Sequence, residues 1–223
     1  NELIISDGTG NNTVLLKDIY PNSGSSSPYG FTQGPNGLTY FIAEDGTTST
    51  NPNNTTTLNG PELWVTDGTS ANTRKVKDVN TFSYIYNSAY YTATTGISNL
   101  TSCNGKMFFT ASDTNYTNQS SFMELWVTDG TTAGTQMVKD INTSTTASTY
   151  PLYSQTLGVS YAQGAQIPFG SDPRSLTCVG NSLFFSADDG AGRMLWKTDG
   201  TTANTVKLRG ISDGSYASNP SNF

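Results

Sequence analysis

Hydrophobic and polar positions alternate in short runs along this chain, and turn-forming residues separate the runs. The clearest series lies near the C-terminal end, at residues 174–179, 182–187, 194–198 and 205–211. Runs of this length with a period of two residues predict β-strands. An amphipathic helical period is not visible anywhere in the sequence. The pattern therefore predicts an all-β protein.

The third run of that series belongs to a phrase that recurs. Residues 62–69 read Glu-Leu-Trp-Val-Thr-Asp-Gly-Thr and return almost unchanged at 124–131, with weaker copies at 2–9 and 194–201. Units of four consecutive strands occupy residues 28–79, 97–141 and 173–211. Such units are typical of propeller blades. We therefore predict one domain over residues 1–223, a β-propeller of four-stranded antiparallel blades.

The first predicted blade is incomplete. Residues 1–20 match only third and fourth strands, and residues 219–223 match the start of a first strand. A four-bladed ring could close if the two termini share this blade, but its second strand would be absent. The blade is then incomplete, or a neighbouring molecule supplies the strand, or the chain is a processed or excised piece of a longer precursor. An unpaired strand edge is a site for strand addition.

The recurring phrase resembles a known family. Glu-Leu-Trp-x-x-Asp-Gly-Thr, followed by Ala133-Gly134-Thr135 and Val138-Lys139-Asp140-Ile141, is similar to the bacterial ELWxxDGT repeat, also called hyalin-like. The resemblance covers nearly all of the chain outside the insertions. It implies a secreted or cell-surface protein with a β-propeller-like fold, and it implies no catalytic residue.

Charge and composition limit the kinds of partner that the protein is expected to bind. The chain has 11 basic and 17 acidic residues, a net charge of −6 and no basic cluster, which argues against nucleic acid as a partner. It has no apolar run of about 18 residues, so we expect no membrane-spanning helix.

The repeats differ mainly in their insertions. These lie at residues 46–61 and 114–122, between second and third strands, and at 80–96 and 142–173, between blades. Both kinds of connection leave an up-and-down blade on the same side, so all four insertions should decorate one face. Tyrosine-rich polar loops are typical of recognition surfaces. The candidate binding residues are Tyr84, Tyr86, Tyr90, Tyr91, Tyr150, Tyr153 and Tyr161. The alternative is that these tyrosines only pack the loops onto the sheets.

Catalytic chemistry has little support. The absence of histidine excludes His-based triads and imidazole metal ligands, which leaves only carboxylate chemistry. Most carboxylates recur once per blade, as expected for scaffold residues, and the aspartates before glycine fit tight turns. Only Glu44, Asp172, Asp188 and Asp213 fall outside these sets. We predict that the protein is not an enzyme and has no cofactor or metal; calcium at the Asp45 and Asp189 turns is the alternative considered.

Three other residue types carry predictions. Trp64, Trp126 and Trp196 lie within third strands and are expected to pack between blades rather than to stack sugars. Cys103 and Cys178 lie in first strands of neighbouring blades on opposite faces, which permits a disulfide, with two buried thiols as the alternative. Asn-x-Ser/Thr sequons suggest glycosylation at Asn11, Asn53, Asn54, Asn99, Asn115, Asn118 and Asn142.

These observations favour a non-enzymatic extracellular structural or adhesive module, a self-assembling subunit of a surface layer or filament. Its partners would be further copies of itself or other surface proteins. The alternative is a carbohydrate-binding, lectin-like propeller that uses the tyrosine-rich loops. A secreted carboxylate hydrolase is a third hypothesis, and it would require two non-repeat carboxylates about 5–10 Å apart in a cleft.

Overall fold

The computed structural model describes residues 1–50, 56–79, 82–86, 89–92, 96–112, 122–147, 152–154, 159–164 and 166–208. Within them the protein is built from antiparallel strands, with one short 3₁₀ turn at Pro35–Gly37. The all-β prediction is confirmed.

Three sheets have four strands each in sequential order. We number them second to fourth, because a two-stranded sheet precedes them at the N-terminal end. The second sheet contains β3 (Tyr29–Gln33), β4 (Thr39–Ala43), β7 (Glu62–Thr66) and β8 (Arg74–Lys77). The third sheet contains β11 (Ser98–Cys103), β12 (Lys106–Ser112), β13 (Met123–Thr128) and β14 (Gln136–Met137). The fourth sheet contains β19 (Arg174–Val179), β20 (Ser182–Asp188), β21 (Arg193–Thr198) and β22 (Val206–Lys207). The predicted strands are present; β22 lies within the predicted run 205–211, of which residues 209–211 lie outside the described residues.

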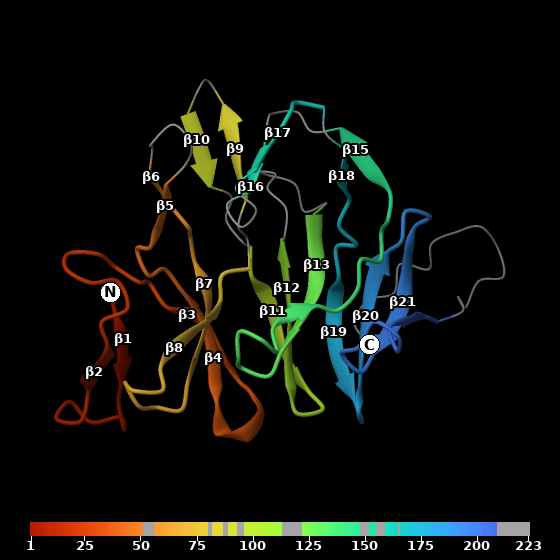
Figure 1. Cartoon of the computed structure of the whole chain (residues 1–223). Coiled ribbons are helices and arrows are strands. Elements are labelled where there is room, and N and C mark those ends of the chain that lie inside the picture. Colours follow the sequence, from red (N-terminus) through yellow and green to blue (C-terminus); the bar gives the residue numbers. More distant parts are fainter. Residues whose placement is uncertain are drawn as a thin grey trace.

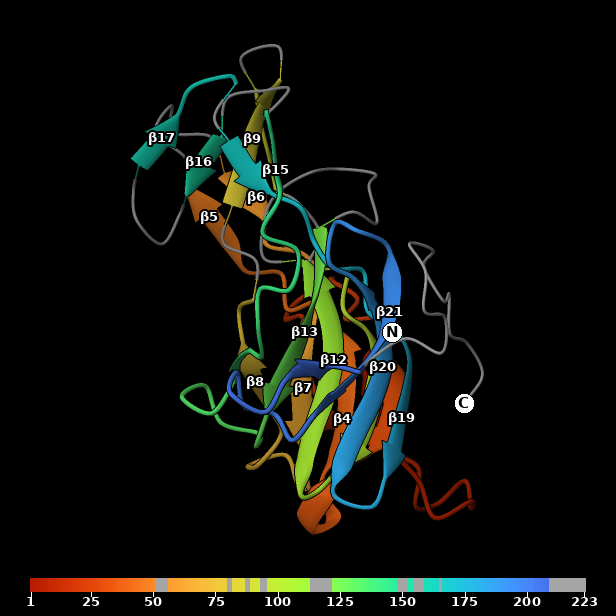
Figure 2. The ribbon, with the colours of Figure 1, turned by 90° about the vertical axis from the view of Figure 1, so that its right-hand side faces the viewer.

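The N-terminal sheet has two strands, β1 (Leu3–Ile5) and β2 (Val14–Lys17). They correspond by sequence to the third and fourth strands of the other sheets, as predicted. The four sheets follow one another along a row, with the N-terminal sheet at one end and the fourth sheet at the other (Figure 1). The view from the right-hand side of Figure 1 has the fourth sheet in front (Figure 2). The predicted ring closure depends on residues 219–223, which lie outside the described residues, so it stays a prediction.

The hydrophobic core lies between the sheets rather than within any one of them. Leu3 and Ile19 pack on Phe41 and Trp64 at the first boundary. At the second, the β4–β8 face with Leu63 packs on Met107, Phe109 and Trp126, and at the third, Phe108 and Leu125 pack on Phe185 and Trp196. Each sheet therefore needs its neighbour to bury its apolar face.

The insertions form strands of their own, which the sequence pattern did not predict. One sheet has the order β10 (Ala89–Thr92), β9 (Phe82–Tyr86), β16 (Leu152–Ser154), β17 (Val159–Tyr161). Two pairs complete the set: β5 (Thr48–Thr50) with β6 (Thr56–Leu58), and β15 (Thr145–Ala147) with β18 (Gln166–Pro168). All eight strands lie above the row of four sheets in Figure 1, in agreement with the prediction that the insertions share one side. Of the insertion at 114–122, only Phe122 lies within the described residues.

Candidate interaction surfaces

The predicted tyrosine surface is a sheet rather than a set of loops. β9 from one blade connection pairs with β16 from the next, so that Tyr84 lies opposite Leu152 and Tyr153 opposite Ser83. Tyr91 pairs with Tyr84 in the β9–β10 hairpin, and Tyr161 pairs with Leu152 in the β16–β17 hairpin. Tyr86 and Tyr90 belong to the β9–β10 hairpin, and Tyr150 lies outside the described residues. Two distant insertions are thereby joined, although the ligand-binding role of these tyrosines stays a prediction.

The repeated aspartate before glycine serves the turn, as predicted. Asp67 accepts hydrogen bonds at Oδ1 from the Thr69 backbone N–H, at 2.9 Å, and from the Thr69 hydroxyl, at 2.6 Å. Its Oδ2 accepts from Asn72 Nδ2 at 2.6 Å. Gly68 holds φ at 90°, where a side chain would be strained. The Thr69 hydroxyl and then Asn72 lower the pKa of Asp67. The same turn recurs at Asp7 and Asp199, and in part at Asp129.

The repeated glutamate joins one sheet to the segment that leads into the next. Glu124 accepts hydrogen bonds from the Ser171 N–H at 2.7 Å and from the Ser171 hydroxyl at 2.6 Å. Glu2 accepts from the same two groups of Ser26 at 2.9 and 2.7 Å, and from the Ile19 N–H at 2.8 Å. Burial acts to raise the pKa of Glu2, but these hydrogen bonds outweigh it and lower the pKa. The glutamate is therefore part of the scaffold.

Glu62 has a different environment. Its side chain is fully buried, and its Oε1 atom, like Asp78 Oδ1, accepts no hydrogen bond within the described residues. Thr95, which by sequence register takes the place of Ser26 and Ser171, lies outside them. Burial first, and then the neighbouring charge of Asp78, raise the pKa of Glu62 to about 10. Burial also raises the pKa of Asp78. This carboxyl pair was missed by sequence reasoning, although both members occupy recurring positions.

The tryptophans pack between sheets, as predicted. Trp64, Trp126 and Trp196 are only 6%, 7% and 6% exposed. Lys77 Nζ lies 5.9 Å from the centre of the Trp126 ring and donates to the Thr135 carbonyl at 2.9 Å. Lys139 repeats both contacts with Trp196 and the Thr205 carbonyl. Because each tryptophan is covered by the preceding sheet, none of the three offers its ring to a sugar.

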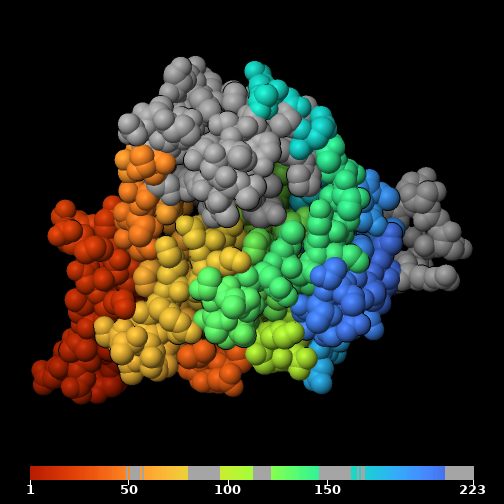
Figure 3. Space-filling view, in the orientation of Figure 1, coloured from red at the N-terminus to blue at the C-terminus, as the bar shows by residue number. Residues whose placement is uncertain are grey.

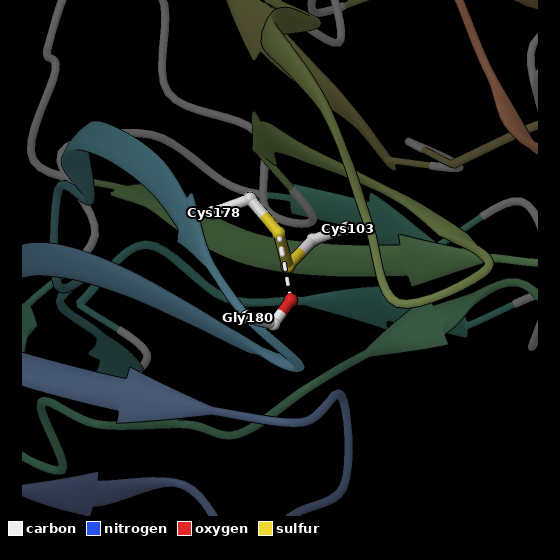
Figure 4. The surroundings of a disulfide bond; sticks show 3 residues. All are labelled: Cys103, Cys178 and Gly180. Carbon is white, nitrogen blue, oxygen red and sulfur yellow. Dashed lines mark hydrogen bonds between the residues drawn. A yellow bond between two sulfur atoms is a disulfide. The ribbon is translucent and has the colours of Figure 1, made fainter.

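The predicted disulfide is confirmed. Cys103 on β11 and Cys178 on β19 are bonded with a Cα–Cα distance of 5.4 Å and a sequence separation of 75 residues (Figure 4). It joins the first strands of the third and fourth sheets. No cysteine of the chain is free.

The turns considered for calcium have lysine partners. Asp45 Oδ2 forms an ion pair with Lys75 at 2.9 Å, and Asp189 Oδ2 forms one with Lys207 at 2.5 Å. Within the part of the chain that is described, no group of three or more potential metal-ligating side chains gathers. The calcium alternative thus gains no support from these contacts.

The carboxylates outside the repeated sets also have local partners. Glu44 accepts from the Gly46 N–H, and Asp188 accepts from the Gly190 and Gly192 N–H groups. Asp172 forms ion pairs with Arg174 and Arg193, both at 2.6 Å. Asp213 lies outside the described residues. These contacts are those of turns and ion pairs rather than of a catalytic pair.

The sequons differ in their surroundings. Asn11 is exposed in the turn between β1 and β2. Asn99 Nδ2, the atom that glycosylation would modify, donates to the Thr110 hydroxyl at 3.1 Å. Asn142 is only 7% exposed, and its Oδ1 accepts from the Ser144 N–H. Asn53, Asn54, Asn115 and Asn118 lie outside the described residues. Of the three described sequons, Asn11 offers the most accessible amide.

A groove of about 300 Å³ lies between β3 and β11. Its floor is apolar, with Ile42, Ile97 and Leu100, and its rim carries uncharged polar groups, including Asn99. Tyr29 lines the groove and is 50% exposed. At the next boundary, β11 and β19 are joined by the disulfide, which lies at the other end of these strands. Sequence reasoning missed this groove because Tyr29 lies within a strand rather than an insertion.

Comparison of the chain with protein-family models, with curated proteins and with solved structures finds no match.

Proposed function

We propose that the protein is a non-enzymatic, extracellular structural module that associates with further copies of itself, and that its sheets are propeller-type blades. One observation carries the proposal. The residues that recur once per repeat join neighbouring sheets: the tryptophan lies in the core between sheets, the lysine donates to the next threonine carbonyl, and the glutamate of the first and third sheets accepts from the serine of the following segment. Such a unit stacks on its own kind.

The extracellular location has two supports. A disulfide across two sheets is typical of proteins from oxidising compartments. The composition, poor in charge and rich in Asn, Ser and Thr, with an exposed sequon at Asn11, fits a secreted protein. Among the described residues, no helix is long and apolar enough to cross a membrane.

The test of self-association is the mass in solution. Sedimentation velocity over a hundredfold range of protein concentration should show species that grow with concentration. A strict monomer at the highest concentration would contradict the proposal. Assays on a panel of glycoside and ester substrates test the non-enzymatic part separately, and turnover that is lost in Glu44→Gln or Asp172→Asn would overturn it.

A second candidate function is binding of a neutral glycan in the groove between β3 and β11. The exposed ring of Tyr29 beside apolar and uncharged polar groups is suited to the apolar face and hydroxyls of a pyranose. Retention on a glycan array should then be lost in Tyr29→Ala and kept in Tyr29→Phe. Retention that survives Tyr29→Ala would place the ligand elsewhere, and the absence of retention would remove this function.

A further inference from the structure

The two ends of the row expose surfaces that every internal boundary buries. At the N-terminal end, Ile4 occupies the repeat position of Trp64, Trp126 and Trp196. Those tryptophans are 6–7% exposed because a preceding sheet covers them, whereas Ile4 is 61% exposed. Leu15, directly opposite Ile4 in the hairpin, is 58% exposed. This face of the N-terminal sheet therefore has the residues of a sheet-to-sheet boundary, but no sheet packs on it.

The fourth sheet presents the complementary half. Phe184, Leu195 and Leu208 hold the repeat positions of residues that are at most 1% exposed in the second and third sheets, namely Tyr40, Leu63, Val76, Phe108, Leu125 and Val138. In the fourth sheet all three are only partly buried. The N-terminal sheet and the fourth sheet lie at opposite ends of the row (Figure 3, red and blue).

At each internal boundary, the Asp-Gly turn of one sheet packs closely against the preceding sheet. A Cβ added to Gly68 would lie 3.7 Å from Ile5 of the preceding sheet. One added to Gly130 would lie 2.8 Å from the Tyr40 hydroxyl, and one added to Gly200 would lie 3.0 Å from Lys106 Nζ. At Gly8, the equivalent in the N-terminal sheet, nothing lies within 4 Å. The Asp-Gly turn at Gly8 therefore has no neighbouring sheet packed against it.

The fourth sheet has a hollow at the position where, at the internal boundaries, the Asp-Gly turn of the next sheet packs. A hollow of about 390 Å³ is lined by Ser182, Lys197 and Val206 among others. By repeat position, Lys197 corresponds to Ile5, which contacts Gly68, and Val206 corresponds to Arg74, which donates to the Gly130 carbonyl. Lys197 is exposed and positive, and Asp7, on the Gly8 turn, is exposed and negative. Shape and charge of the two ends are therefore complementary.

Resting on the proposed self-association, we propose that copies of this chain stack head to tail. The outward face of the fourth sheet of one copy receives the N-terminal sheet of the next, with Ile4 over Phe184, Leu195 and Leu208, and the Asp7-Gly8 turn in the hollow beside Lys197. The contact repeats the boundary already used inside the chain. Because the two faces differ and lie at opposite ends, the contact is heterologous and gives an open filament when it does not close into a ring.

The decisive experiment uses two full-length variants, one for each face. Ile4→Asp blocks the N-terminal face and Lys197→Glu blocks the hollow, while both positions are exposed in the single molecule, so folding should be unaffected. Each variant alone should be monomeric in sedimentation velocity, with at least about a 100-fold weaker association than the unmodified protein. In Ile4→Asp the cause is an unpaired charge in an apolar contact, and in Lys197→Glu it is repulsion between the new carboxylate and Asp7. Their equimolar mixture should form a dimer, since each supplies the face that the other has lost.

Matched controls are Ile4→Val and Lys197→Arg, which should assemble like the unmodified protein. If the mixture stays monomeric, or if Ile4→Asp alone still associates, head-to-tail stacking is wrong. Leu58→Asp probes the rival surface, because Leu58 is 45% exposed on the β5–β6 insertion. Loss of assembly in this variant alone would move the contact to the insertions, whereas an unmodified protein that never associates would overturn the proposed function itself.

Discussion

The boundary between the second and third sheets and the boundary between the third and fourth share one framework but are reinforced differently. Both have a buried tryptophan, a lysine on a threonine carbonyl and an apolar core. Among the described residues of these two boundaries, only the third–fourth has the Cys103–Cys178 disulfide and a glutamate that accepts hydrogen bonds from a serine; Thr95, the counterpart of that serine beside Glu62, lies outside the described residues. The second–third boundary has the buried Glu62–Asp78 pair and an open groove instead.

This difference separates what a repeat needs from what a particular copy adds. The shared contacts define how sheets stack, whereas the unshared ones decide how firmly each boundary holds. We therefore expect the third–fourth boundary to be the more stable of the two, and the second–third boundary to be the one that depends on pH.

Removal of the disulfide should have the largest effect on this comparison. Replacing both cysteines by serine frees a loop of 75 residues in the unfolded chain, which should lower the free energy of unfolding by about 4 kcal/mol. Urea unfolding followed by circular dichroism measures the loss. A loss below about 1 kcal/mol would mean that the disulfide does not make the third–fourth boundary the more stable one.

Replacement of the two glutamates by glutamine should give opposite results. Both oxygens of Glu124 accept hydrogen bonds from Ser171, so Glu124→Gln replaces two hydrogen bonds to a carboxylate by weaker ones to a neutral amide and should cost about 2 kcal/mol. The raised pKa of Glu62 keeps this side chain protonated near neutral pH, and glutamine resembles the protonated acid. Glu62→Gln should therefore change the free energy of unfolding by less than about 0.5 kcal/mol at pH 4, and should raise it at pH 7, where the unmodified protein has to take up a proton on folding and the variant does not. Equal losses in the two variants would contradict this account.

The dependence of stability on pH should follow Glu62. Its pKa rises from 4.5 to about 10 on folding, so the folded state holds a proton that the unfolded state releases above pH 4.5. The contribution of Glu62 to stability is fully present below pH 4.5 and is lost as the pH rises toward 10. Between pH 5 and pH 9 the unmodified protein should lose more than about 1 kcal/mol relative to Glu62→Gln. Parallel stability curves for the two proteins would show that the group does not titrate in this way.

The smallest expected effect tests the shared framework. Lys77→Met and Lys139→Met each remove a hydrogen bond to a threonine carbonyl and a cation–π contact with a tryptophan. Each should lower the free energy of unfolding by about 1 kcal/mol, and by the same amount at both boundaries. Losses of unfolding free energy, measured by urea unfolding, that differ by more than about 1 kcal/mol between the two variants would show that the lysines belong to the individual boundary instead of to the repeat.

Much of this architecture is determined locally, and the sequence was sufficient to predict it. Alternation with a period of two fixes the strands of the last three sheets, and Asp-Gly turns with glycine at positive φ fix where the third strand ends. The equivalence of Glu-Leu-Trp phrases identified the tryptophans as core residues. Opposite parity of Cys103 and Cys178 permitted a disulfide, because neighbouring sheets meet through opposite faces, and the structure has the disulfide rather than two buried thiols.

Other features were decided only by the tertiary structure. The pairing of β9 with β16 joins insertions about 70 residues apart, and their Tyr-, Ser- and Thr-rich sequences contain no signal that selects a partner strand. The raised pKa of Glu62 depends on burial beside Asp78, which a repeated motif does not reveal, since Glu2 and Glu124 have serine donors instead. The exposure of Ile4 and the hollow at Lys197 likewise exist only because a stack of sheets has two ends. Local pattern thus determines each sheet, whereas long-range packing determines which surfaces remain to bind something else.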